Sequence, residues 1–397
     1  MMRKLLQLSI ASALATVFMV PALAQSGAVR PRRVSPSAPP PATESSTSSM
    51  PTSRAETSAA RPATDTMRAY SLLQQKQYAA AAKEAKQIAA IDPKNSEAWK
   101  IAGFAEFNLK QYEEAASDLQ KALDLQRAAK QEDPNTVDAL AQAYVRTEKF
   151  DRALPLLVAA TTRAGARPDP LMLYYRGLAE HRTGKIADAE RSLNEAVKAD
   201  PKNAAALYYL GRIAYEKNDL DGAISALNRA TASDPQQANA WALLATVYLR
   251  RAAGAAEAKA EADYLNAVRA GENLYRIKPD ATSATLLGQA LIGAKQYPRA
   301  ATTLERAAAG DDVQGGTLYL LGVAHSRAKN FPKAIAALER AAAKTPDDVN
   351  IYRELGYAYE VSKQYAKALA AYQKGAQLAP DDADFKESIQ RVQPFAK

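Results

Sequence analysis

The sequence predicts an all-α protein built from repeated pairs of helices. Its 397 residues include only 17 Gly and 7 Phe beside an excess of Ala, Leu, Gln, Lys and Glu, a composition typical of helices that pack through small side chains. Phrases of Pro and acidic residues punctuate the apolar segments, and two intervals, Pro201 to Pro235 and Pro346 to Pro380, are 34 residues long. A fixed period of this length indicates a helical repeat array.

Residues 1–24 have the pattern of a secretory signal peptide. Arg3 and Lys4 precede an apolar run that ends at Val20, and small residues such as Ala24 are what signal peptidase accepts. We therefore expect cleavage after Ala24 and export to the periplasm. The alternative is an uncleaved membrane anchor, but the run of about 16 residues is shorter than the roughly 20 that span a bilayer.

Residues 25–61 are rich in Ser, Thr, Pro and Ala and hold almost no aliphatic side chain to bury. Because burial cannot offset the entropy of ordering here, we predict a disordered linker. Seven of the 52 basic and two of the 43 acidic side chains lie before residue 62, so the rest of the chain has a net charge of +4. Such a weak positive charge argues against a nucleic-acid partner.

Nine repeat units are expected between residues 62 and 380. They start near Pro62, Ser96, Pro134, Pro170, Ala204, Ala238, Ala281, Gly315 and Val349. A small residue stands where the first helix meets the second: Ala69, Gly103, Ala141, Gly177, Gly211, Ala245, Gly288, Gly322 and Gly356. On the second helix, the residue expected at the same contact is always alanine: Ala81, Ala115, Ala153, Ala189, Ala223, Ala267, Ala300, Ala334 and Ala368. A bulky side chain precedes each second helix: Tyr78, Tyr112, Phe150, Ile186, Leu220, Tyr264, Tyr297, Phe331 and Tyr365.

This spacing, with Trp99, Gly103, Tyr112, Ala115 and Ala122 inside one unit, closely resembles the tetratricopeptide repeat. The resemblance implies a right-handed superhelical solenoid whose first helices line a concave groove, in which extended peptides or partner helices bind.

Four irregularities are also expected in the array. Residues 130–133 are extra, Pro155 should bend a second helix, and residues 251–263 should lengthen both helices of unit six into a projecting hairpin. Apolar residues at helical spacing within residues 381–397 predict a capping helix.

The expected groove combines aromatic and arginine side chains. Tyr and Arg are frequent binding hot spots because they join a large contact area to directional polar contacts. The alternative is that these side chains pack between neighbouring repeats. The candidate residues are Phe104, Phe107, Asn108, Gln142, Arg146, Tyr174, His181, Arg182, Tyr208, Arg212, Tyr215, Arg250, Tyr319, Arg327, Arg353 and Tyr357. We expect changes at Arg146, Arg182, Tyr174 or Tyr208 to leave folding intact.

Catalysis and metal binding find no support in the sequence. The absence of Cys excludes a disulfide and a thiolate zinc site, and only His181 and His325 are available as imidazole ligands. Phosphate-loop, nucleophile-elbow and paired-carboxylate motifs are missing as well. We expect neither an enzyme nor a cofactor.

The sequence therefore favours a periplasmic scaffold or adaptor that binds another envelope protein, which could be acidic, during assembly, secretion or maintenance of the envelope. Some family members, the co-chaperones, grip a carboxylate with Lys and Asn side chains. Unit two has Lys100 and Phe104 at those places and unit five has Tyr208 and Arg212, so that chemistry is disfavoured. The alternative function is a module for an acidic polysaccharide in exopolysaccharide export, because Tyr faces and Arg suit such a polymer.

Overall fold

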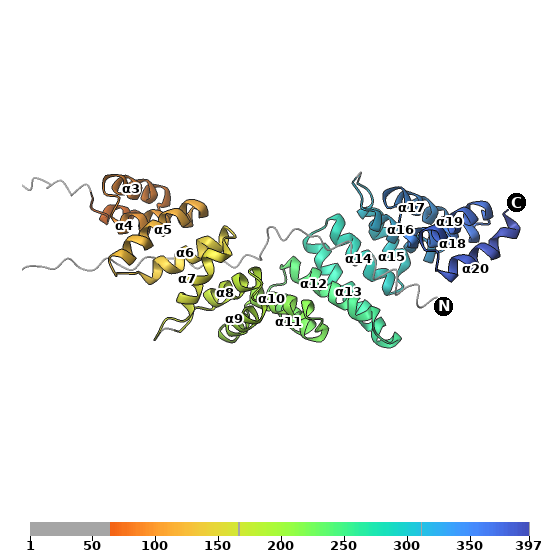
Figure 1. Cartoon of the computed structure of the whole chain (residues 1–397), viewed down its shortest axis with the longest axis horizontal. Coiled ribbons are helices and arrows are strands. Elements are labelled where there is room, and N and C mark those ends of the chain that lie inside the picture. The colour runs from red at the N-terminus through yellow and green to blue at the C-terminus, as the bar shows by residue number, and fades with distance from the viewer. Residues whose placement is uncertain (1–63, 166, 311, 397) are drawn as a thin grey trace, which may run out of the picture. The chain divides into compact units, whose positions relative to one another are not determined.

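The computed structural model describes residues 64–165, 167–310 and 312–396, and all regular structure within them is helical (Figure 1). The all-α fold class is thereby confirmed. The predicted signal peptide (1–24) and linker (25–61) lie outside the described residues. The described chain forms two units, 64–209 and 210–396, each a row of antiparallel helix pairs.

Each pair consists of a first and a second helix joined by a short turn. The first helices are α2 (Met67–Gln74), α4 (Ser96–Asn108), α6 (Pro134–Arg146), α8 (Pro170–Arg182), α10 (Ala204–Glu216), α12 (Ala238–Ala253), α14 (Ala281–Gly293), α16 (Gly315–Arg327) and α18 (Val349–Val361). The second helices are α3 (Tyr78–Ile91), α5 (Tyr112–Ala128), α7 (Phe150–Thr161), α9 (Ile186–Ala199), α11 (Leu220–Ser233), α13 (Glu257–Ile277), α15 (Tyr297–Ala307), α17 (Phe331–Lys344) and α19 (Tyr365–Leu378). A final helix, α20 (Ala383–Val392), leads into the short 3₁₀ helix η1 (Gln393–Phe395).

Side-chain caps explain where most of the first helices, and α20, begin. The Asn95 side chain accepts a hydrogen bond from the backbone N–H of Ala98 at 3.0 Å, and Asp280 forms a reciprocal capping box with Ser283. These side chains satisfy backbone donors that have no partner inside the helix. The same role falls to Asp133, Asp169, Asn203, Asp348 and Asp382. The recurring Pro and Asp phrases of the sequence therefore mark helix starts.

The turn inside most pairs contains one residue in the left-handed region of backbone conformation. Only one of these residues is a glycine, Gly184, with φ of +78°. The others are Lys76, Lys110, Glu148, Asn218, Lys295, Lys329 and Lys363. This conformation is common just after a helix and reverses the chain direction within a few residues, which places the second helix antiparallel to the first.

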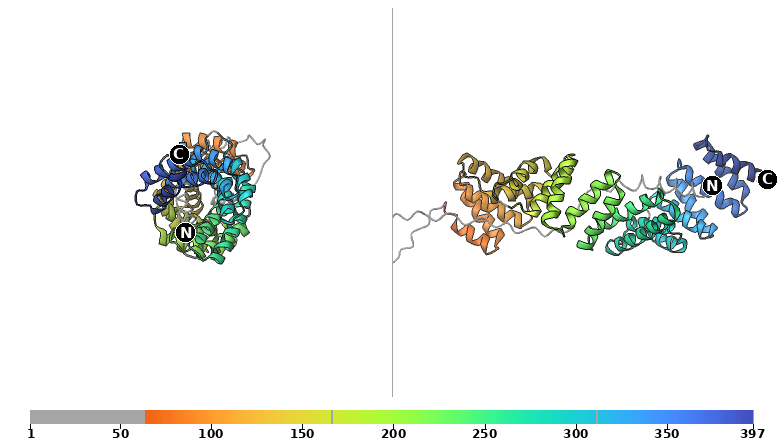
Figure 2. Two further views of the ribbon diagram at one scale, coloured as in Figure 1. Left: turned by 90° about the vertical axis from the view of Figure 1, so that its right-hand side faces the viewer. Right: turned by 90° about the horizontal axis from the view of Figure 1, so that it is seen from below.

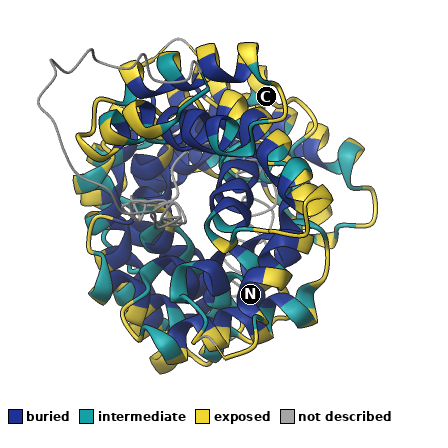
Figure 3. Cartoon of the chain, turned by 90° about the vertical axis from the view of Figure 1, so that its left-hand side faces the viewer, coloured by how far each residue is buried: buried dark blue, intermediate teal, exposed yellow. Residues whose placement is uncertain are grey.

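Small residues permit close contact between the two helices of a pair. Each of the nine predicted second-helix alanines, from Ala81 to Ala368, is fully buried. A β-carbon added to Gly177 would lie 2.6 Å from the Cγ of Leu193, which is also fully buried. Figure 3 shows buried residues along the helices, with exposed residues in the loops and on the outer sides of helices. Small residues thus determine how closely the two helices of a pair approach each other.

Successive first helices also contact one another. In the first unit α2 meets α4, α4 meets α6 and α6 meets α8, whereas the second helices of successive pairs approach each other less. The right-hand view of Figure 2 shows these pairs following one another in residues 64–209. The same contacts join α12, α14, α16 and α18 in the second unit. In each unit the first helices therefore form one continuous layer.

The sequence irregularities have clear structural counterparts. Helices α12 and α13 are 16 and 21 residues long, which confirms the predicted lengthening of pair six. Tyr264 lies within α13, whereas in the other pairs the bulky residue is the first residue of the second helix. Helix α7 continues through Pro155, and the predicted bend stays a prediction. Helix α20 packs on α19 and buries Phe385 and Val392.

Candidate functional site

The candidate groove residues lie on the first helices, but they differ widely in exposure. Six are buried: Phe104, Phe107, Gln142, Tyr174, His181 and Tyr319. Eight are half-buried: Asn108, Arg146, Arg182, Tyr208, Arg212, Tyr215, Arg327 and Arg353. Arg250 and Tyr357 are exposed. Tyr174 is only 2% exposed, so the expectation that its replacement would leave folding intact is wrong, because a cavity would replace the ring.

Arg146, at the end of α6, is held by two aromatic side chains. Its guanidinium carbon lies 6.0 Å from the centre of the Tyr112 ring, and its Nη2 donates a hydrogen bond to the Tyr175 hydroxyl at 3.2 Å. In the described part of the chain no carboxylate oxygen lies within 4.0 Å of this guanidinium, and its Nε is buried without a hydrogen-bond partner. Arg146 therefore carries a positionally fixed positive charge without a counter-ion.

Arg182 occupies the corresponding place on the next first helix, α8. Its guanidinium carbon lies 5.2 Å from the centre of the Phe150 ring, and Nη2 is 3.4 Å from the Glu148 carboxylate. Glu148 is half exposed and the ion pair is long, so it is worth little in water. A stronger acidic ligand could displace Glu148. Arg146 and Arg182 thus form two successive cationic positions, each against an aromatic ring.

An aromatic cluster supports this region from beneath. The ring centres of Tyr174 and Tyr175 are 5.3 Å apart, and Tyr209 lies 6.2 Å from Tyr174, 5.6 Å from His181 and 5.2 Å from Tyr208. Burial raises the pKa of the Tyr174 hydroxyl well above its ordinary value, with smaller contributions from Tyr209 and Tyr175. The Tyr174 hydroxyl therefore stays neutral near neutral pH. The cluster joins α8 to the start of α10.

Acidic side chains gather at the opposite ends of the same helices. Lys100 Nζ lies 2.6 Å from Glu97 and 3.1 Å from Asp133. Asp138 pairs with Arg163 at 3.0 Å. Burial raises the pKa of Asp138, Arg163 opposes this, and the charges of Asp169 and Asp133 add to the increase. We call Glu97, Asp133, Asp138 and Asp169 the acidic edge.

The arginines of the second unit differ, because most of them already have acidic partners. Arg327 donates to both carboxylate oxygens of Glu354, at 3.1 and 2.7 Å. Arg353 pairs with Asp382, which caps α20. Arg212 pairs with Glu216 at 2.9 Å within α10. Arg250 stacks 5.0 Å from the Tyr215 ring centre. Residues 210–396 therefore use these guanidinium groups mainly within the fold.

Comparison with known families decides the classification. Four segments, 66–134, 139–190, 182–238 and 319–383, match the sequence model described as tetratricopeptide repeat, and together they cover more than half of the chain. The chain belongs to the tetratricopeptide repeat family. Residues 260–341 also match the model described as anaphase-promoting complex, cyclosome, subunit 3. No curated protein sequence matches the chain.

Several solved structures resemble parts of the chain. YrrB, described as a TPR protein with an unusual peptide-binding site, is 17% identical, with 50% of this chain and 97% of YrrB covered and a TM-score of 0.43. MamA is 22% identical over 46% of this chain and 96% of its own, with a TM-score of 0.40. A repeat protein from Parabacteroides merdae is 14% identical over 66% and 98%, with a TM-score of 0.42. We base the family assignment on the sequence matches alone.

One recurring polar contact between repeats escaped the sequence analysis. The eleventh residue of several pairs reaches back to the second helix of the preceding pair. Tyr144 donates to Gln120 at 2.9 Å, and His325 lies 3.3 Å from Glu305. The same contact joins Glu106 to Lys86, Tyr248 to Asn228 and Tyr359 to Glu339. The signal was an unusual polar or Tyr side chain at one fixed repeat position.

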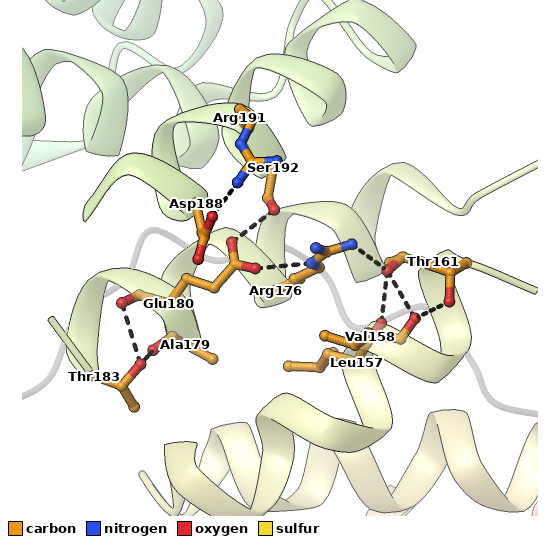
Figure 4. A network of polar contacts seen from close by, with 11 residues as sticks. Leu157, Val158, Thr161, Arg176, Ala179, Glu180, Thr183, Asp188, Arg191 and Ser192 are labelled. Carbon is orange, nitrogen blue, oxygen red and sulfur yellow. Dashed lines mark hydrogen bonds and ion pairs between the residues drawn. The ribbon is translucent and has the colours of Figure 1, made fainter. Parts of the chain in front are cut away.

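Pair four uses this position differently, and Figure 4 shows the network that results. Glu180 is almost fully buried, accepts from Arg176 Nε at 2.8 Å and from Ser192 Oγ at 2.6 Å, and so satisfies both carboxylate oxygens. Arg176 Nη1 also donates to Thr161 of the preceding helix at 3.1 Å. This network joins α7, α8 and α9. Its members satisfy one another, which indicates a structural role.

Neither a metal site nor a membrane span is found in the described parts of the chain. Across residues 64–165, 167–310 and 312–396, no group of three or more His, Asp or Glu side chains is arranged to hold a metal ion. None of the helices described there is both long and apolar enough to cross a bilayer.

Proposed function

We propose that this protein is an adaptor that binds another protein through the first-helix face of residues 64–209. By first-helix face we mean the exposed side of α4, α6 and α8 that carries Asn108, Arg146 and Arg182. The single observation that carries the proposal is Arg146, a guanidinium fixed by Tyr112 and Tyr175 with no carboxylate within 4.0 Å in the described chain. A cation held in this way suits an acidic group on a partner.

The physical basis is preorganisation. Binding normally costs conformational entropy for each flexible side chain that becomes ordered, about 0.5 to 1.5 kcal/mol. Arg146 and Arg182 are already ordered against aromatic rings, so this cost is largely met during folding. A guanidinium also donates two parallel hydrogen bonds to a carboxylate. Arginine and tyrosine side chains of this kind are those most often found as binding hot spots.

We further propose that the protein acts in the periplasm, on another envelope protein. The support is the pattern of residues 1–24, which combines a basic start, an apolar run and small residues up to Ala24. A long surface of helical repeats offers room for an interface of about 800 Å² on each partner. An adaptor in envelope assembly, secretion or maintenance fits these properties.

The direct test is a cross-linking pull-down from periplasmic extract. We expect the wild-type protein to capture a defined partner band and the R146A/R182A double variant to lose it. The matched control is R191A, because Arg191 on α9 is 75% exposed and, within the described residues, its ion pair is with Asp188 of its own helix. If the double variant and wild type capture the same proteins, the first-helix face is not the binding surface.

The second candidate function is binding of an acidic polysaccharide, which the two stacked arginines also favour. If the face bound an acidic polysaccharide, a polyanion would compete with the captured protein, and its competition would weaken steeply with salt because exposed charges are screened. Because we propose protein binding, we expect polygalacturonate to leave the captured band unchanged. Displacement of the band at low salt would instead support the polysaccharide function.

A further inference from the structure

The second helices of the last three pairs carry an excess of basic side chains. Helices α15, α17 and α19 together hold seven basic and two acidic residues. Helices α5, α7 and α9, the second helices of pairs two to four, instead hold five basic and eight acidic residues. The excess therefore belongs to pairs seven to nine and is not a general property of the second helices.

The two acidic residues of these three helices are already engaged by neighbouring side chains. Glu305 lies 2.9 Å from Lys333 and 3.3 Å from His325 of α16. Glu339 accepts a hydrogen bond from the Tyr359 hydroxyl of α18. Most of the basic residues on α15, α17 and α19 therefore have no carboxylate of these helices to pair with.

Three of the basic residues recur at one repeat position. Arg306, Arg340 and Lys374 are each the tenth residue of their helix, follow one another at intervals of 34 residues and are exposed. In the described chain the ion pairs of α15 and α17 involve Arg299 and Lys333, and no carboxylate oxygen lies within 4.0 Å of the three residues at the tenth position. Three successive second helices therefore each present an unpaired cation at an equivalent place.

A cavity of about 560 Å³ lies beside Arg340, between α17, the end of α15 and the start of α16. Lys344 also lines it, one turn after Arg340 and on the same side of α17. The other lining residues are small or apolar and include Ala308, Val313 and Leu318, all three of which are buried. The cavity thus combines an apolar floor with two exposed cations.

One described acidic residue, Asp312, lies in the loop that borders the cavity. Its side chain is exposed, and within the described chain it forms no ion pair with Arg340 or Lys344. It reduces the local positive charge without neutralising either cation directly. Its replacement therefore offers a test in which the binding of an anion should become stronger.

The row of cations and the apolar cavity together restrict the ligand. A protein surface of mixed charge would bring some of its basic side chains against the row, and like charges at an interface oppose association. An acidic polysaccharide supplies negative charge but few apolar groups for the floor that Val313 and Leu318 form. An anionic lipid layer supplies both, because its phosphate groups adjoin the apolar acyl chains.

We propose that the second-helix surface of pairs seven to nine binds an anionic phospholipid bilayer. By second-helix surface we mean the exposed side of α15, α17 and α19 that carries Arg306, Arg340, Lys344 and Lys374. A headgroup phosphate accepts charge-assisted hydrogen bonds from Arg340 and Lys344, and the adjoining apolar atoms of the same lipid contact the cavity floor. Arg306 and Lys374 bind neighbouring headgroups. This inference does not rest on the proposed function, which concerns the first helices of residues 64–209.

Flotation of the purified exported protein with vesicles tests the proposal. We expect binding to vesicles of equal parts phosphatidylglycerol and phosphatidylcholine, and none to phosphatidylcholine alone. R340A/K344A should weaken binding about thirtyfold, since each basic side chain near an anionic surface contributes about 1 kcal/mol. The matched control is R191A/K198A, which removes the same charge from exposed positions of α9 and should bind as wild type does. D312N should bind more tightly than wild type.

Soluble ligands test the role of the cavity. In isothermal titration, dihexanoyl phosphatidylglycerol below its micelle concentration should bind more tightly than glycerol 3-phosphate, because its acyl atoms reach the apolar floor. Circular dichroism must show that R340A/K344A remains folded. If that variant proves unstable, R306A/K374A removes two cations outside the cavity and should also weaken vesicle binding about thirtyfold.

Three results would overturn the lipid proposal. The first is equal flotation of wild type, R340A/K344A and R191A/K198A. The second is equal affinity for glycerol 3-phosphate and the short-chain lipid, which would reduce the site to a phosphate site. The third is binding of polygalacturonate without binding of the mixed vesicles, which would make the ligand a polysaccharide. None of these results bears on the pull-down through Arg146 and Arg182, so the proposed function would stand or fall separately.

Discussion

At the scale of single residues, two arginines at the same repeat position behave differently. Arg146 and Arg327 are each the thirteenth residue of their pairs, and each bonds the sixth residue of the next pair. That residue is Tyr175 for Arg146 and Glu354 for Arg327. A tyrosine hydroxyl leaves the guanidinium charge available, whereas a carboxylate neutralises it. The partner residue, about 30 positions away in sequence, therefore decides which arginine can bind a ligand.

Glu106 illustrates how a buried carboxyl depends on its neighbours. It is 2% exposed and pairs with Lys86 of α3. Burial raises the pKa of Glu106 above its ordinary 4.5; Lys86 opposes the shift, and the nearby charges of Asp118 and Glu114 on α5 add to it. In pair four the residue corresponding to Asp118 is Ser192, which donates a hydrogen bond instead.

This environment predicts a pH-dependent effect of E106Q. A carboxyl whose pKa is raised by folding contributes stability below its unfolded-state pKa, and the contribution is lost as pH rises through the folded-state pKa. The free energy of unfolding of E106Q, relative to wild type, should therefore increase as pH rises from the unfolded-state pKa of this carboxyl through its folded-state pKa. Urea unfolding at several pH values measures it, with exposed E113Q as the control. Parallel curves for wild type and E106Q would contradict the assignment.

Arg251 joins the two long helices of pair six, α12 and α13, through an ion pair with Asp263. It donates to both oxygens of Asp263, at 2.9 and 2.6 Å, and Asp263 is 2% exposed. R251A should destabilise the protein by roughly 3 kcal/mol, because it leaves a buried carboxylate without its partner. The control is R276A, an exposed arginine at the other end of α13. Equal unfolding midpoints for R251A and R276A would show that the ion pair adds no stability.

At the scale of helices, the sequence predicts most of the architecture. The helix starts follow from Asn and Asp caps, and close packing follows from Gly and Ala at fixed positions, since both depend on local residue type. The left-handed turn residues were not foreseen, because Lys110 and Lys329 carry no local signal for positive φ. Phe104 and Tyr174 follow the alternative of packing inside the fold, which the sequence could not assign to particular residues because their burial depends on the neighbouring pair. The partner of each arginine also lies in the neighbouring pair. The sequence therefore could not distinguish Arg146, which bonds a tyrosine, from Arg327, which bonds a carboxylate.

Two glycines of α16 provide a matched test of helix packing. A β-carbon on Gly322 would lie 2.4 Å from the Cγ of buried Leu338, whereas one on Gly316 meets nothing within 4 Å. G322A should lower the free energy of unfolding by roughly 1 to 3 kcal/mol, as expected for overpacking. G316A should leave it unchanged or raise it slightly, since alanine favours helix more than glycine does. Equal destabilisation by both substitutions would refute the packing argument.

At the scale of the whole molecule, the two units differ in how their arginines are paired. Both are rows of tetratricopeptide repeat pairs whose first helices form a layer. In residues 210–396 Arg327 is paired with Glu354 of α18, and Arg353 is paired with Asp382, the N-cap of α20. In residues 64–209 Arg146 remains without a carboxylate partner among the described residues. The proposal of protein binding therefore concerns residues 64–209.

Export is a prediction for the entire chain. The protein recovered from periplasm should begin at Gln25, because the pattern of residues 1–24 places signal cleavage after Ala24. Intact-mass spectrometry of that fraction measures this directly, and an A24R variant should slow cleavage. Recovery of the full-length chain from the membrane fraction would contradict the proposed periplasmic location.

The central claim, that the first-helix face of residues 64–209 binds a protein partner, is tested most directly by photo-cross-linking in cells. Benzoylphenylalanine would replace Asn108, which is half-buried on α4 at the position corresponding to Arg146 on α6. The control position is Arg191, exposed on α9. We predict one discrete cross-linked protein from position 108 and none from position 191. Cross-linking from position 191 alone would contradict the claim.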